Sequence, residues 1–365
     1  MKILKSNLGL IFISILIALL LLEVTFSLTF KKKYNNYNLA QEKYMLFEQG
    51  DVFNNVDNFF KYYPNKKILS KTFYKLENEF VEEYSYEITT NNFGLVQDNN
   101  ILKNKISILF LGDSFIEGQG ATPWVNNFNG NFNQYQIING GIIGTGPQQF
   151  ELMEKHISEF FSIEKVFLFY IGGDFRRDIY QIPNNTINCL KNSNNCAGDE
   201  NFYGFSIRNK SPEEFLIYLS NYRYELDLIF EKNYPKFKKF RRKIKKGIAN
   251  LYIFKIPLNY LKQKFYKSKN IKIKKNFESL KRLNDKYDNN IFFIQIRNKD
   301  EIINDKKYYE TLYSENFIKK ISKNHFVCDF NNDINFYYKI DGHPNESGYQ
   351  YLFECVKKIM VNNLS

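Results

Sequence analysis

The sequence predicts an α/β protein built on a parallel sheet with helices on both faces. Apolar runs of five to seven residues alternate with helical segments, and several runs end in glycine-rich or acidic turns. This alternation is typical of strand–helix–strand units. A length of 365 residues suits one large domain with additions. The expected strands are residues 106–111, 135–139, 165–171, 290–296 and 325–330.

The first strand, 106–111, reads ISILFL and is followed by Gly112, Asp113 and Ser114. A continuous apolar run of this length suits a parallel strand buried on both faces. Helical spacing of apolar residues predicts a helix over residues 146–161 and a closing helix over 347–360. Ligands of such sheets bind at the carboxyl ends of the strands. We therefore expect the functional residues in the turns that follow them.

An apolar run at residues 9–30 lies between lysines near the amino terminus. As a helix it spans about 33 Å, enough to cross a bilayer. It is longer than the apolar core of a secretory signal, and no small-residue cleavage site follows it. Residues 1–33 are therefore predicted to be a single-pass anchor, with the large C-terminal part of the chain outside the cytoplasm. Glu23 is either an interfacial residue or a contact to a partner helix.

The net charge of +12 comes from one segment. Between Lys232 and Lys286 there are 20 basic and two acidic residues, whereas the chain outside this segment and the first 33 residues carries −10. The segment is a solvated helical face, or it binds an anionic membrane surface or an acidic glycan. Nucleic acid ranks last, because an exported domain does not meet it and no binding motif is present.

These features divide the chain into four parts. After the anchor, residues 34–102 form a polar, aromatic stem that packs on the main domain. Residues 103–178 and 288–365 form the α/β domain, and 179–287 are a basic, mostly helical insertion between its third and fourth strands.

The four cysteines divide into two pairs. Cys189 and Cys196 flank a short Asn-rich loop and are either paired in a disulfide or free. Cys328 lies on an expected strand and Cys355 on the closing helix, so both are predicted to be core residues. No spacing indicates a metal site, and we expect no cofactor.

The candidates for chemistry are one serine and one of three histidines. Ser114 stands at a strand-to-helix turn, where a hydroxyl faces the ligand cleft, although such a serine is also a common helix N-cap. Of His156, His325 and His343, the last lies in a turn-rich stretch beside Asp341. A carboxylate this close can orient an imidazole to act as a base. Other acids that could orient His343 are Asp329 and Asp333.

Four blocks follow one another at the expected strand ends: GDSF at 112–115, NGGIIGTG at 139–146, GGD at 172–174 and DGHPN at 341–345. As an ordered set they resemble the SGNH/GDSL hydrolase superfamily, over about residues 84–178 and 290–360. A further stretch, TNNFG at 90–94, is similar to the segment before the first block in membrane-anchored bacterial members. The resemblance implies a three-layer α/β/α, flavodoxin-like fold.

The resemblance also implies roles for single residues. Ser114 would be the nucleophile and would give a backbone N–H to the oxyanion hole, with Gly144 as the second donor. His343 would be the general base and Asp341 its orienting acid. The expected reaction forms an acyl-enzyme from an ester, with hydrolysis or transfer of an acyl group such as O-acetyl on an envelope glycan or lipid.

The chain departs from the family pattern at two points. Many relatives place the acid three residues before the histidine, whereas this chain has Ile340 there. The third block normally supplies an asparagine side chain to the oxyanion hole, and this chain has Gly173 there. Losing one such donor typically costs about 10²–10³ in rate. A catalytically weak or inactive scaffold that binds a glycan is therefore the alternative function.

Overall fold

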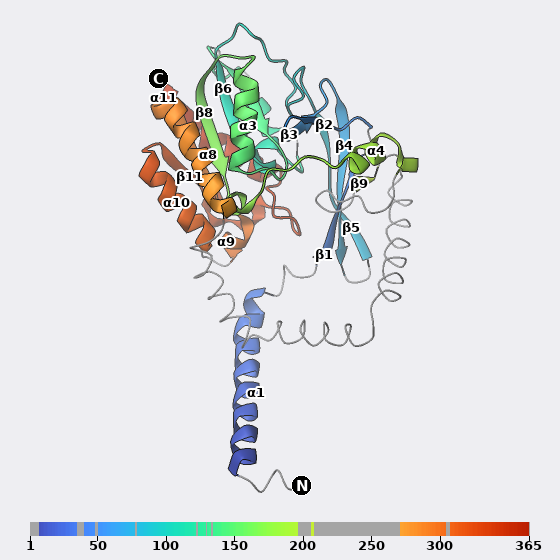
Figure 1. The fold of residues 1–365 in the computed structure, drawn as a ribbon, viewed down its shortest axis with the longest axis vertical. Coiled ribbons are helices and arrows are strands. Elements are labelled where there is room, and N and C mark those ends of the chain that lie inside the picture. Colours follow the sequence, from blue (N-terminus) through green and yellow to red (C-terminus); the bar gives the residue numbers. More distant parts are fainter. Residues whose placement is uncertain are drawn as a thin grey trace. The chain divides into compact units, whose positions relative to one another are not determined.

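The computed structural model describes residues 7–34, 40–47, 50–76, 79–121, 123–128, 130–132, 134–195, 206–207, 271–303 and 307–364. The chain divides into two compact units (Figure 1). One consists of Met1–Leu39 and Leu216–Asn270, and the other of Ala40–Phe215 and Ile271–Ser365.

In the first unit, helix α1 spans Asn7–Tyr34 and covers the apolar run at 9–30. Leu10, Leu20 and Leu21 are among its exposed apolar side chains. Within the described ranges, no helix combines the length and the apolar character needed to cross a membrane. The predicted transmembrane helix is therefore not supported.

The second unit is built on a five-stranded parallel sheet (Figure 1). Its strands are β6 (Ser107–Gly112), β7 (Gln136–Gly141), β8 (Ile163–Tyr170), β10 (Ile291–Ile296) and β11 (His325–Cys328). Their order is β11-β10-β8-β6-β7. In chain order this is the 2-1-3-4-5 arrangement of flavodoxin-like sheets, with the switch point between β6 and β8. The predicted α/β fold on a five-stranded parallel sheet is confirmed.

Helices cover both faces of this sheet. Side chains of β6 alternate between two core clusters, with Leu109 and Leu111 in one and Ile108 and Phe110 in the other. The first cluster is completed by α3 (Pro147–Ser158), α8 (Ile271–Tyr287) and α10 (Tyr309–Ile321). The second is completed by α2 (Ser114–Glu117), η2 (Trp124–Phe128), α9 (Lys299–Ile303) and α11 (Glu346–Leu364). The shorter elements η3 (Gly172–Arg176), α4 (Asn184–Lys191), η4 (Ser193–Asn195), η5 (Asp288–Asn290), η6 (Phe330–Asn332) and η7 (Ile334–Phe336) lie in the connections.

Residues 34–102, predicted as a stem, contribute a second sheet to the same unit. Its order is β5 (Glu79–Thr89), β4 (Lys67–Leu76), β1 (Ala40–Phe47) and β9 (Ser206–Ile207). The first three strands are antiparallel, and β2 (Phe53–Val56) and β3 (Phe59–Tyr62) form a separate hairpin. Phe47, Phe53 and Tyr62 are buried in the same cluster as the side chains of β6. We refer to residues 40–89 as the added sheet.

The basic insertion was predicted to end at residue 287, and the structure differs there. Helix α8 belongs to the second unit and packs on α3. Arg282 binds Glu151 at 2.6 Å and Lys286 binds Glu154 at 2.8 Å across this contact. The α/β domain therefore resumes at Ile271, because the apolar face of α8 completes the core. The strongly basic stretch at 236–247 lies outside the described residues.

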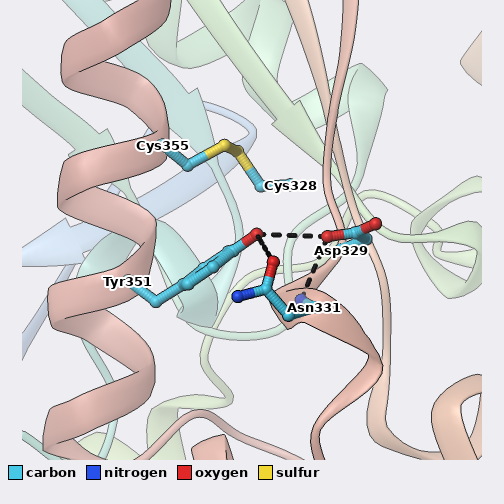
Figure 2. Close-up of a disulfide and its surroundings, with 5 residues drawn as sticks. All are labelled: Cys328, Asp329, Asn331, Tyr351 and Cys355. Atoms are coloured by element: carbon cyan, nitrogen blue, oxygen red, sulfur yellow. Dashed lines mark hydrogen bonds between the residues drawn. A yellow bond between two sulfur atoms is a disulfide. The ribbon is translucent and has the colours of Figure 1, made fainter.

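Cys328 and Cys355, predicted as separate core residues, form a disulfide (Figure 2). Strand β11 is an edge strand that packs against α11, which brings the two Cα atoms to 6.2 Å, a distance that a disulfide spans. Cys189 is also disulfide-bonded. The proposed partner, Cys196, lies outside the described residues, so that pairing stays a prediction.

Candidate active site

The turn after β6 presents Ser114 at the start of a helix. The N-cap of α2 is Asp113, whose side chain accepts a hydrogen bond from the Phe115 N–H at 3.0 Å. Gly118 ends this helix with φ of 94°, a value that favours glycine. Since Asp113 takes the capping role, the Ser114 hydroxyl is available for another partner.

That partner is His343. The Ser114 hydroxyl lies 2.7 Å from His343 Nε2, and His343 Nδ1 lies 2.6 Å from Asp341 Oδ1. A carboxylate at Nδ1 places the proton there and leaves Nε2 as the acceptor for the serine proton. Ser114 and Asp341 are each 4% exposed, which excludes most bulk water from this chain of hydrogen bonds. The structure thus brings the three predicted catalytic residues together.

The loop that carries the histidine is held from several sides. Tyr338 N–H donates to the His343 carbonyl at 3.1 Å, and Tyr337 pairs with Pro344 in an isolated β-bridge. Lys299, which is buried, donates from Nζ to the carbonyls of Tyr338, Lys339 and Asp341. The Asp–His pair therefore sits on a loop with several fixed points on each side, which keeps the imidazole aimed at Ser114.

The second oxygen of the Asp341 carboxylate binds two side chains of the added sheet. Lys43 Nζ lies 2.9 Å from Oδ2, and the Tyr84 hydroxyl donates to the same atom at 2.6 Å. Burial by itself raises the pKa of Asp341, but the Lys43 and His343 charges and the His343 and Tyr84 hydrogen bonds outweigh it and hold the pKa well below its usual range. The orienting acid is ionised at any pH at which His343 acts as a base.

The sequence predicts the backbone N–H groups of Ser114 and Gly144 as oxyanion donors. Ser114 N–H and Gly144 N–H have no acceptor in the part of the chain that the structure describes. The Gly144 loop lies over the end of β6, because the Ile142 N–H and the Thr145 hydroxyl both donate to the Gly112 carbonyl, at 3.2 and 3.3 Å. Gly144 has φ of 72°, which again favours glycine. The role of these two N–H groups as oxyanion donors stays a prediction.

The Glu117 side chain contacts the Gly144 loop, and the sequence did not predict a role for this residue. Its carboxylate accepts the Ile143 N–H at 2.5 Å and the Tyr62 hydroxyl at 2.9 Å. Burial raises the pKa of Glu117 to about 8, although both hydrogen bonds act in the opposite direction. The Ile143 N–H belongs to the peptide before the one that carries the Gly144 N–H, so this contact anchors the loop beside Gly144. The Tyr180 hydroxyl donates to the Ile143 carbonyl at 3.1 Å, on the peptide that carries the Gly144 N–H.

Arg177 joins three of the strand-end blocks. Its guanidinium lies 2.9 Å from Asp113, 2.9 Å from Asp174 and 2.6 Å from the Thr145 carbonyl. Asp174 is fully buried, and burial together with the Asp113 charge raises its pKa. Arg177 follows the third block closely, but its role depends on contacts with two other blocks that no local pattern reveals.

At position 173 only backbone is present. Gly173 lies in η3, and a Cβ built on it meets no atom closer than 3.9 Å. The space for a side chain is therefore available, and the third oxyanion donor implied by the family resemblance is missing from it.

The other sequence candidates lie elsewhere. His156 packs among Phe59, Phe93 and Phe160 and lies 3.4 Å from Lys61, which fits a structural role. His325 contacts the Tyr170 hydroxyl. The two alternative acids cap short turns, because Asp329 and Asp333 accept the backbone N–H groups of Asn331 and Asn335.

The structure thus places a Ser–His–Asp hydrogen-bond chain at the carboxyl edge of a doubly wound sheet. No protein-family model and no curated protein matches the chain. Among solved structures it is similar to a GDSL-like lipase from Bacteroides thetaiotaomicron, at 14% identity over 70% of this chain and 88% of that one. The TM-score of this match is 0.29.

Proposed function

We propose that this protein is a serine esterase of the SGNH/GDSL type that forms an acyl-enzyme on Ser114. The observation that carries the proposal is the unbroken hydrogen-bond chain from Ser114 through His343 to Asp341. A hydroxyl within 2.7 Å of an imidazole whose far side is bound to a buried carboxylate is the arrangement that activates a serine.

The reaction follows from these positions. His343 Nε2 takes the Ser114 proton as the oxygen attacks the ester carbonyl, and the N–H groups of Ser114 and Gly144 bind the oxyanion. His343 then gives the proton to the departing alcohol as the C–O bond breaks. Water, or a hydroxyl of a second acceptor, repeats the sequence on the acyl-enzyme and frees Ser114.

We propose an acylated envelope glycan or lipid as the substrate, with an O-acetyl group as one example of the acyl group. The sequence resemblance supports this class. The basic stretch between Lys232 and Lys286 would then hold the enzyme on an anionic membrane surface or an acidic glycan, through charges other than those that α8 pairs with α3.

We also propose that the α/β domain works outside the cytoplasm. The Cys328–Cys355 disulfide supports this location, since disulfides persist in oxidising compartments. The apolar run at 9–30 is the sequence argument for attachment to a membrane. Fractionation of cells that express the full chain, with carbonate extraction of the membrane pellet, tests both statements.

A fluorophosphonate probe tests the function directly, because it reacts with activated serines. We expect the full chain to be labelled, Ser114→Ala to be unlabelled, and His343→Ala to lose most of the labelling. Ser107→Ala, at the start of the same strand, is the matched control and should label normally. A folded protein that remains unlabelled would rule out the esterase.

The alternative is a glycan-binding scaffold with little activity. The bare backbone at Gly173 favours it, because one oxyanion donor is absent. It predicts that acylated glycan binds equally well to the full chain and to Ser114→Ala and is released unchanged by both.

A further inference from the structure

We propose that Lys43, from the added sheet, is a positioning residue that neutralises the Asp341 carboxylate and so extends the working range of His343 to lower pH. The inference deepens the proposed function and rests on it, since it concerns the base of the same site.

The geometry places the carboxylate between a cation and an imidazole. Lys43 Nζ is 2.9 Å from Asp341 Oδ2, and His343 Nδ1 is 2.6 Å from Oδ1. The Asp341 side chain is 4% exposed and that of Lys43 is 25% exposed, so solvent screens this pair weakly. The ammonium is therefore close enough to act on the imidazole through the shared carboxylate.

Other groups face the carboxylate from each neighbouring element, and two of them are charged; Lys299 interacts with the Asp341 charge, but its hydrogen bonds go to backbone carbonyls of the loop. Glu83 of β5 accepts the Ile340 N–H at 2.7 Å, and Lys299 of α9 lies 3.2 Å from the Asp341 carbonyl oxygen. The tyrosines near Asp341 are Tyr74 of β4, Tyr84 and Tyr86 of β5, and Tyr338 of the loop. Burial, followed in most cases by the Asp341 or a neighbouring carboxylate charge, raises the pKa of all four, so they stay neutral.

Tyr84 orients the pair without changing its charge. Its hydroxyl donates to Asp341 Oδ2 and accepts a hydrogen bond from Gln119 Nε2 at 2.7 Å. Lys43 Nζ lies 3.5 Å from the same hydroxyl. Since the hydroxyl proton is directed at Asp341, Lys43 is the group that adds positive charge at this oxygen.

The sign of the effect follows from electrostatics. His343 must be neutral to accept the serine proton. A positive charge beside the Asp341–His343 pair disfavours uptake of the first proton, so the pair stays unprotonated to lower pH. Removing the charge should raise the pH at which His343 becomes protonated by about one unit, at the lower end of shifts caused by a close charge.

Substitutions at Lys43 separate charge from packing. Lys43→Met keeps the aliphatic stem, Lys43→Gln keeps a hydrogen-bond donor without the charge, and Lys43→Arg keeps the charge. Lys67→Met is the matched control, because Lys67 lies on β4 of the same sheet and its partner is the exposed Glu87.

The first readout is an NMR titration of the full chain labelled at the histidine rings. Its three histidines are assigned with His343→Ala and His156→Ala. In Lys43→Met and Lys43→Gln, the His343 midpoint should move up by about one unit, while His156 and His325 keep theirs. Lys43→Arg and Lys67→Met should match the unmodified chain. An unchanged or lowered His343 midpoint in both neutral variants would overturn the proposal.

The second readout is the pH profile of kcat/KM for p-nitrophenyl acetate. The acidic limb should move up by the same amount in the neutral variants, with the plateau at high pH retained. Because the NMR titration does not require turnover, failure of the esterase proposal and failure of the Lys43 proposal give different results. Absent turnover in every variant rejects the esterase, whereas normal turnover with an unmoved limb rejects the role of Lys43 alone.

Discussion

Gly173 is the residue at which the site departs most from the family pattern, and the structure makes the departure testable. Its backbone φ is not in the left-handed region, and a Cβ there has no neighbour closer than 3.9 Å. A side chain can therefore be added at the end of β8 without displacing Ser114 or the Gly144 loop.

We expect Gly173→Asn to raise kcat about 10- to 100-fold, because an amide donor at this position adds a third hydrogen bond to the oxyanion. Initial rates with p-nitrophenyl acetate over a range of concentrations give kcat and KM separately. The gain should fall on kcat, since the oxyanion exists only in the transition state.

Gly173→Ala is the control for this substitution. It fills the same space without a donor and should leave the rate within about twofold of the unmodified chain. If Gly173→Asn performs no better than Gly173→Ala, the amide does not reach the oxyanion, and another group serves as the third donor.

The disulfide between Cys328 and Cys355 links strand β11 covalently to helix α11. It closes a ring of chain from Cys328 to Cys355 that contains Asp341 and His343. Within the ring, Tyr351 of α11 binds both Asp329 and Asn331 at the start of the loop, and its ring stacks on Phe330. The disulfide and the Tyr351 contacts thus hold β11, α11 and the start of the loop that follows β11 together.

The double variant Cys328→Ala/Cys355→Ala should lower the free energy of unfolding by about 3.5 kcal/mol, the chain-entropy value for a ring of this length. Urea denaturation at constant pH measures it. Reduction of the unmodified chain is a less clean test, because Cys189 is also in a disulfide. A denaturation midpoint equal to that of the unmodified chain would show that packing alone holds β11 on α11.

The elements that the sequence predicted share a local signal. Strands β6 and β10 are apolar runs buried on both faces, and the proposed nucleophile, base and backbone donors follow strand ends in the chain. The Lys43 and Tyr84 contacts had no such signal, because they lie 298 and 257 residues from Asp341 in the sequence. One pattern could have revealed the added sheet: in β5, buried Tyr84, Tyr86 and Ile88 alternate with more exposed residues.

At the scale of the whole unit, the added sheet and the α/β sheet share one core. Phe60 of β3 is fully buried, and its ring lies 5.6 Å from that of Phe53 and 5.1 Å from that of Tyr180, which follows η3. Lys61, next in the chain, donates to the Phe93 carbonyl at 2.8 Å and lies over the Phe93 ring. The added sheet is therefore an integral layer of the second unit and supplies the cation beside the Ser114–His343–Asp341 chain.

This continuity predicts that the added sheet and the catalytic site unfold together. Phe60→Ala should lower the free energy of unfolding by about 3–5 kcal/mol, as expected when a buried aromatic ring is removed. The melting temperature of this variant should fall, and circular dichroism and the NMR signal of the His343 imidazole should report the same lowered melting temperature. Leu102→Ala is the matched control, because this side chain is 49% exposed, and it should leave the melting temperature from both signals unchanged. If the His343 signal instead persisted to the melting temperature of the unmodified chain while the sheet signal fell early, the two sheets would be separate folding units.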